Sequence, residues 1–192
     1  MENSLLMKTD VSFALNFLIY IQNIFLNQSQ TKEELKFPYL STRISFNEDF
    51  EIMYKELWSE VSESISDDNI SCEIRFYEEK DLFYQRLFEI NSDSLKQFRE
   101  IYKTFEVWWN SFAGRFSVER SIDEMGQNLY MDLADSLIKR GIKPEKALSI
   151  SLIYDECLLA NAEVSSYFAV LPIRDFFVQY KVLVSKLQEC FY

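Results

Sequence analysis

Residues 95–112 read LKQFREIYKTFEVWWNSF, and this stretch decides the fold class. Large apolar side chains recur along it every three or four residues, namely Leu95, Phe98, Tyr102, Phe105, Trp109 and Phe112. Because an α-helix has about 3.6 residues per turn, these side chains form one continuous stripe along a helix. Such a stripe has to be buried against other elements, so the stretch predicts a core helix that is broken at Gly114.

The same helical period extends over most of the chain. It predicts further helices over residues 10–28, 48–66, 79–90, 122–140, 144–171 and 173–190. Two of these helices carry terminal signals. Ser121 and Glu124 have the spacing of a capping box, and Gly141 suits the C-terminal cap of the same helix. Pro144 suits the first turn of the helix that follows.

Two short stretches, 39–46 and 70–77, alternate between apolar and polar residues instead. Alternation is typical of strands, so these stretches predict, at most, a small two-stranded β element. The predicted fold class is mostly α, a compact bundle of about five to seven helices with that small β element. We expect a single helical domain over residues 1–192, with a β-α-β-like acidic segment at 39–81.

Composition excludes several kinds of active site. The chain has 192 residues, no histidine and three cysteines. Without histidine it cannot form a Ser-His-Asp triad or a histidine-ligated zinc site. The cysteines lie far apart inside apolar stretches, which is typical of buried thiols. We therefore expect a protein that is not an enzyme and has neither a cofactor nor a resident metal.

The most apolar run lies near the N-terminus. Residues 11–26 read VSFALNFLIYIQNIFL and are interrupted by Asn16, Gln22 and Asn23. The run is shorter than the ~20 apolar residues that a membrane-spanning helix needs, and no basic segment precedes it as in a signal peptide. We therefore expect a buried first helix, no membrane association and a cytoplasmic location.

The negative charge is concentrated in one segment. The whole chain carries a net charge of −11, from 31 acidic and 20 basic residues. Between Glu48 and Asp81, twelve acidic residues stand against three basic ones, so this segment carries −9 of the total. On a helix, Glu56, Glu60, Glu63 and Asp67 fall within about 60° of one another. The pattern predicts one strongly negative surface rather than evenly spread charge.

A surface of this kind favours a basic protein as partner, because complementary charge speeds association and selects the partner. We expect the protein to neutralise such a partner by covering its cationic surface, as toxin-immunity proteins, antitoxins and inhibitors of host defence do. The predicted partner-binding residues are Glu56, Glu60, Glu63, Asp67, Asp68, Glu73, Glu78, Glu79 and Trp108. Trp108 is included because two adjacent tryptophans on a helix cannot both point into one core. Direct nucleic-acid binding is not expected, since the sequence has no basic stripe.

Three other interpretations stay open. The acidic residues fit equally well the solvated face of an amphipathic helix. The carboxylates Asp132, Asp135, Asp155 and Glu156 could serve a Mg²⁺- or Mn²⁺-dependent hydrolase of nucleotides or phosphoesters, since these ions accept oxygen ligands alone. A structural ion pair with Arg140 or Arg174 is the simpler explanation of Asp155 and Glu156. Finally, the phenylalanine-rich helices could join copies of the chain into a structural assembly.

Overall fold

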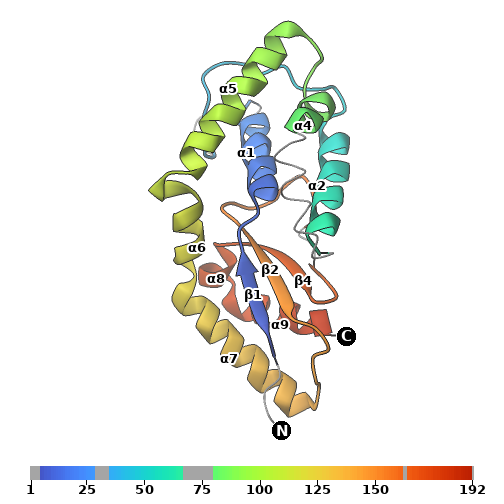
Figure 1. Ribbon diagram of the computed structural model, residues 1–192, viewed down its shortest axis with the longest axis vertical. Helices are drawn as coiled ribbons and strands as arrows, with labels where there is room; N and C mark the ends of the chain where they lie inside the picture. Colours follow the sequence, from blue (N-terminus) through green and yellow to red (C-terminus); the bar gives the residue numbers. More distant parts are fainter. Residues whose placement is uncertain (1–4, 29–34, 67–79, 162–163, 192) are drawn as a thin grey trace. The chain divides into compact units, whose positions relative to one another are not determined.

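The computed structural model describes residues 5–28, 35–66, 80–161 and 164–191, and Figure 1 shows their helices and strands. The chain divides into two compact units. The first, which we name the sheet unit, comprises Met1–Ser12, Ala113–Glu156 and Ala162–Tyr192. The second, the helical unit, comprises Phe13–Phe112 and Cys157–Asn161. Along the chain, the helical unit is therefore inserted after the first strand of the sheet unit.

The helical unit is built from α1 (Phe13–Asn27), α2 (Phe50–Ser66), α4 (Lys80–Leu87) and α5 (Ser92–Trp109). Each of these helices begins and ends within three residues of a helix predicted from the sequence. Their apolar stripes meet in an aromatic core. Phe17 of α1 lies at its centre, with ring centroids 5.4 Å from Phe83 of α4 and 5.3 Å from Tyr102 of α5. Both ring pairs are edge-on, the arrangement that aromatic pairs favour.

The amides that interrupt the apolar sequence of α1 are paired within the helical unit. Gln22 is buried, and its Oε1 accepts hydrogen bonds from the backbone N–H groups of Leu158 at 2.7 Å and Leu159 at 3.1 Å. Asn23 donates from Nδ2 to the backbone carbonyl of Phe37 at 2.8 Å. Buried amides need such partners, and here they tie two distant chain segments to one core helix.

The sheet unit contains the strands β1 (Met7–Asp10), β2 (Leu148–Ile153), β3 (Val164–Ser165) and β4 (Phe168–Pro172), in the order β1-β2-β4-β3. β2 runs parallel to β1 on one side and to β4 on the other, whereas β3 pairs antiparallel with β4. In this register Ile150 stands opposite both Thr9 and Ala169. The inner strands β2 and β4 are almost entirely buried, as is typical of parallel strands covered on both faces.

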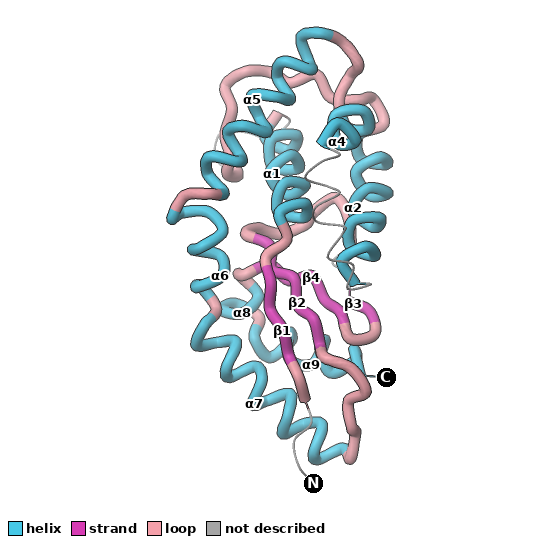
Figure 2. The backbone as a smooth tube through the Cα atoms, in the orientation of Figure 1, coloured by secondary structure: helices cyan, strands magenta, loops and turns pink. Residues whose placement is uncertain are grey.

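Helices α6 (Ser117–Ser121), α7 (Asp123–Arg140), α8 (Asp175–Val178) and α9 (Tyr180–Gln188) complete the sheet unit. A π-helical turn at Phe112–Phe116 precedes α6, and a 3₁₀ turn at Glu189–Phe191 follows α9. Figure 2 shows α8 and α9 behind the sheet, with α7 beside them. Polar contacts join α7 to α9: Tyr180 donates from its hydroxyl to Asp132 Oδ2 at 2.7 Å, and Arg140 donates to Gln188 Oε1 at 2.8 Å.

The predicted helix over 144–171 is wrong. This stretch contains the strands β2, β3 and β4, joined by loops. A strand buried on both faces shows a nearly continuous apolar run, and periodicity alone does not separate such a run from a buried helix. The partner that stabilises β2 on one side is β1, which lies about 140 residues earlier in the chain, so the local sequence does not reveal the pairing.

The predicted strand over 39–46 is also wrong. These residues form a loop, and only Phe46 makes an isolated antiparallel bridge, to Phe88. The second predicted strand, 70–77, lies outside the described residues. The alternating residues do not share one buried face, because Ile44 is buried while Leu40 is only half-buried and Thr42 is exposed.

Of three predicted helix boundaries, two are confirmed and one is wrong. The C-terminal cap is confirmed, because Gly141 has a φ of 69° and closes the helix. The capping box is wrong: α7 begins at Asp123 without a side-chain cap, and Ser121 donates to the backbone carbonyl of Val118 instead. The break predicted at Gly114 is confirmed by its non-helical backbone angles.

The predicted fold class is confirmed, since the described residues are mostly helical and carry one small sheet. That sheet is assembled from other parts of the chain than the sequence predicted. The single domain over 1–192, with an acidic segment at 39–81, stays a prediction. Within the described residues, every helix is too short or too polar to cross a membrane.

Candidate functional site

The predicted acidic face lies on α2. The buried side of this helix belongs to the core and consists of Phe50, Tyr54, Leu57, Trp58, Val61 and Ser62. Glu56, Glu60 and Glu63 are exposed, and at about 100° per residue they share one sector away from the centre of that buried side. Three of the predicted partner-binding residues therefore stand together on one surface.

Two of these carboxylates are held by Arg86 of α4. Its Nη1 donates to both carboxylate oxygens of Glu60 at 2.7 Å, and its Nη2 donates to Glu56 Oε2 at 2.8 Å. The Arg86 side chain is only 20% exposed, whereas the two glutamates are about half exposed. Hydrogen bonding to Glu60 is the main cause that raises the pKa of Arg86 above its ordinary value. Arg86 thus fixes two side chains that would otherwise be mobile and repel each other.

An apolar side chain adjoins the carboxylates. Ile52 precedes Glu56 by one helical turn and is 56% exposed. A large aliphatic group this accessible beside charged groups gives a partner something to bury as well as something to pair with. We name Ile52, Glu56, Glu60 and Glu63 the α2 face.

Trp108 lies on α5, away from these residues in sequence, and its environment is aromatic. Its ring contacts Phe37 at 5.2 Å between centroids and stacks on Tyr20 at 6.1 Å. It is half-buried, whereas the adjacent Trp109 is buried. The expectation that the two rings face different surroundings is confirmed, and the role of Trp108 as an anchor stays a prediction.

The remaining predicted partner-binding residues, Asp67, Asp68, Glu73, Glu78 and Glu79, lie outside the described residues. The described part of the acidic segment still carries Glu48, Asp49 and Glu51 as exposed residues, near the start of α2.

The carboxylates proposed for a hydrolase are distributed over the sheet unit. Glu156 forms an ion pair with Arg174 at 2.5 Å, which confirms the structural pairing expected for this residue. Asp132 accepts the hydrogen bond from Tyr180, and burial together with that bond raises the pKa of Tyr180. In the part of the chain that the structure describes, no three acidic or cysteine side chains gather as a metal site would require.

Comparison of the chain with known protein families, with curated proteins and with solved structures finds no match.

Sequence reasoning missed Arg86. The sequence around Arg86 shows only a helical period, and its partners lie 26 and 30 positions earlier. A weak signal existed, because Arg86 is the single cation in the short helix at 80–87 besides Lys80 at its start. Pairing across two helices depends on how they pack, which a one-dimensional pattern does not contain.

Proposed function

We propose that this protein binds a basic protein partner through the α2 face and covers a cationic surface on that partner. The observation that carries the proposal is the exposed row of Glu56, Glu60 and Glu63, of which two are held in place by Arg86. Side chains that are already ordered lose less conformational entropy on binding than free ones.

Charge arithmetic supports the proposal. Arg86 offsets one of the three negative charges, so the α2 face keeps a net negative charge after its internal pairing. The protein as a whole carries −11. A fixed local charge within an overall negative field attracts a cationic partner over about a Debye length, ~8 Å at physiological salt. Ile52 then supplies the apolar contact that surface charges alone do not provide.

The mechanism is occlusion. A partner whose basic surface binds an anionic substrate, such as a nucleic acid, loses access to that substrate while the α2 face occupies it. This is the mode of action of an immunity protein, an antitoxin or an inhibitor of host defence, and in this proposal the protein acts beside its partner in the cytoplasm. The protein itself contacts no nucleic acid in this scheme.

The test is a pull-down from lysate of the source organism with Glu63→Lys as the key variant. Glu63 makes no contact with Arg86, so its reversal changes the face without breaking the ion pairs between α2 and α4. Glu51→Lys is the matched control, because it makes the same charge change on α2 about 120° away from Glu63. A basic protein retained at low salt by the wild type and the control, and lost from Glu63→Lys, supports the proposal. Equal retention by all three proteins contradicts it.

A further inference from the structure

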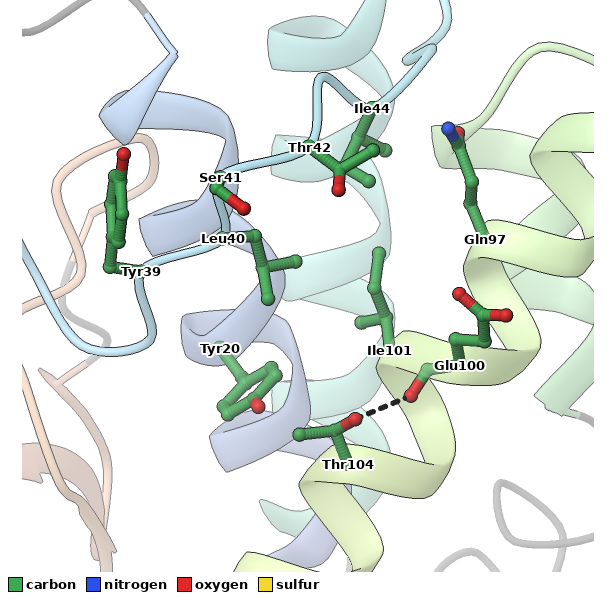
Figure 3. A pocket seen from close by; sticks show the side chains of 10 residues that line it. All are labelled: Tyr20, Tyr39, Leu40, Ser41, Thr42, Ile44, Gln97, Glu100, Ile101 and Thr104. Atoms are coloured by element: carbon green, nitrogen blue, oxygen red, sulfur yellow. Dashed lines mark hydrogen bonds between the residues drawn. The ribbon is translucent and has the colours of Figure 1, made fainter.

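A pocket of about 280 Å³ lies in the helical unit between α1, α5 and the loop at residues 39–44 (Figure 3). Tyr20 of α1 forms its base together with Ile44 and Ile101, all three buried. Glu100 and Thr104 of α5 lie at its rim and are exposed. The volume is just below the range for drug-sized sites, and it has ample room for a ligand of a few heavy atoms.

The walls of this pocket are fixed by hydrogen bonds. Gln97 of α5 donates from Nε2 to the carbonyl of Arg43 at 3.1 Å and accepts from the N–H of Ser45 at 3.4 Å, so its amide is used to hold the loop. Asn27 of α1 donates to the carbonyls of Lys36 at 2.7 Å and Pro38 at 2.9 Å, which anchors the chain just before the loop. Because hydrogen bonds hold the loop at 39–44 at both of its ends, the pocket is already formed before a ligand binds.

The base of the pocket holds a hydroxyl group that no described protein group occupies. Tyr20 is 1% exposed, and its hydroxyl makes no hydrogen bond with any described residue. Burial raises its pKa to about 12, so the hydroxyl stays protonated and able both to donate and to accept. In the view of Figure 3 the Tyr20 ring lies between Leu40 and Thr104. Among the described residues the buried side-chain atoms without a partner belong to Trp58, Ser62 and Ser151, so the Tyr20 hydroxyl is still reached by solvent from the pocket. A ligand group that bonds to it replaces a water molecule there.

The rim selects the charge of the ligand. Thr104 donates its proton to the carbonyl of Glu100 at 2.7 Å, so towards the pocket its oxygen can only accept. The Glu100 carboxylate is also an acceptor, and the described residues that line the pocket include no lysine or arginine. An anionic ligand would meet a carboxylate without any compensating cation. The rim therefore favours a group that donates hydrogen bonds and carries positive charge.

We propose that this pocket binds a small amino alcohol, an ammonium group and a hydroxyl joined by a short apolar chain. The ammonium group pairs with Glu100 and Thr104 at the rim, and the hydroxyl bonds to Tyr20 at the base. The apolar chain packs on Leu40, Ile44 and Ile101. This site is independent of the α2 face, since none of its residues belongs to that face.

The proposal is tested with three probes of similar length: 4-amino-1-butanol, n-butylammonium and 1,4-butanediol. Binding to the ¹⁵N-labelled full chain is followed by NMR titration, in which the amide signals of residues 39–44 and 97–104 report on the pocket. We expect the amino alcohol to bind most tightly, in the millimolar range that so small a ligand can reach.

Two variants separate the two contacts. Glu100→Gln should weaken both ammonium probes about threefold and leave butanediol unchanged, as expected for a partly exposed ion pair. Tyr20→Phe should weaken the two hydroxyl-bearing probes about three- to tenfold and leave butylammonium unchanged. Glu106→Gln, the same change on another face of α5, should alter nothing. Glu100 is exposed, so its variant keeps the test usable even if Tyr20→Phe disturbs folding.

Three results would overturn the proposal. Butanediol binding as tightly as the amino alcohol would remove the role of charge. Equal binding by Glu100→Gln and the wild type would remove Glu100 from the site. Signal changes confined to residues outside the pocket would place the ligand elsewhere.

Discussion

Arg86 donates from one nitrogen to both carboxylate oxygens of Glu60, each at 2.7 Å, while its second terminal nitrogen reaches Glu56. One side chain of α4 thereby joins two residues of α2 that stand four positions apart. Without the guanidinium, two like charges at this spacing would destabilise α2 by a few tenths of a kcal/mol. The contact serves the stability of the helical unit and the order of the α2 face at once.

This contact predicts an unequal cost for two arginine substitutions. Arg86→Gln should lower the free energy of unfolding by about 1 kcal/mol, because it removes a largely buried cation shared by two carboxylates. Arg115→Gln breaks a single i,i+4 pair with Glu119, in which the arginine is 60% exposed, and should cost no more than about 0.5 kcal/mol. Urea denaturation of both variants at low and high salt measures the difference. An equal cost for the two substitutions would contradict the stabilising role of the Arg86 contact.

Substitutions of Gly126 inside α7 and of Gly141, its C-terminal cap, should change stability in opposite directions. Gly141 has a φ of 69°, which side chains with a Cβ rarely adopt, so Gly141→Ala should lower the free energy of unfolding by about 1 kcal/mol. Gly126 lies inside the helix, and an added Cβ would sit 3.6 Å from Ile122 Cδ1, an ordinary contact distance. Gly126→Ala should therefore raise the free energy of unfolding by about 0.5–1 kcal/mol. Thermal denaturation of each variant gives the sign directly, and the same sign for both would refute the assigned backbone constraint.

Sequence patterns predicted those parts of the fold that depend on local spacing. The stripe from Leu95 to Phe112 placed α5 correctly because helical contacts involve residues three and four positions apart. The sheet was missed because β2 pairs with β1 from the other end of the chain, and neither strand is stable alone.

The candidate site likewise combines features that follow from local sequence spacing with features that depend on packing. The shared face of Glu56, Glu60 and Glu63 follows from helical geometry and was predicted. The role of Arg86 was not, since it depends on the packing of α4 against α2. The pocket was missed for the same reason: Tyr20 and Glu100 come from different helices, and the tyrosine alone looks like an ordinary core residue.

Replacing the buried Ser62 should stabilise the protein. Its hydroxyl is buried on α2 and has no hydrogen-bond partner in the described structure. Ser62→Ala should raise the free energy of unfolding by about 1 kcal/mol, because it removes an unpaired polar group and improves helix propensity. Ser59→Ala is the control, because Ser59 lies on the more accessible side of the same helix and its replacement improves only the helix propensity. Chemical denaturation compares the two. A loss of stability at Ser62 would show that its hydroxyl contributes a hydrogen bond.

Ionisation of Tyr20 should make the stability of the protein depend on pH in the alkaline range. Its pKa is raised from 10.0 to about 12 in the folded protein by burial, so the folded state holds a proton that the unfolded state has released. A raised pKa contributes stability that is complete below about pH 10 and is lost as the pH rises towards 12. In that window the unfolded state binds fewer protons, and the contribution of Tyr20 falls by about 1.4 kcal/mol per pH unit.

The comparison with Tyr20→Phe isolates this contribution, because every other titrating group, Tyr180 included, is the same in both proteins. Urea denaturation from about pH 8 to about pH 11 should show the wild type losing free energy of unfolding more steeply than Tyr20→Phe above pH 10, and the two running parallel below it. Absorbance of tyrosinate near 295 nm follows the same ionisation in the folded protein and should show one fewer late-titrating phenol in the variant. Parallel curves throughout would mean that the Tyr20 phenol is as well hydrated in the folded protein as in the unfolded one, and they would contradict its raised pKa.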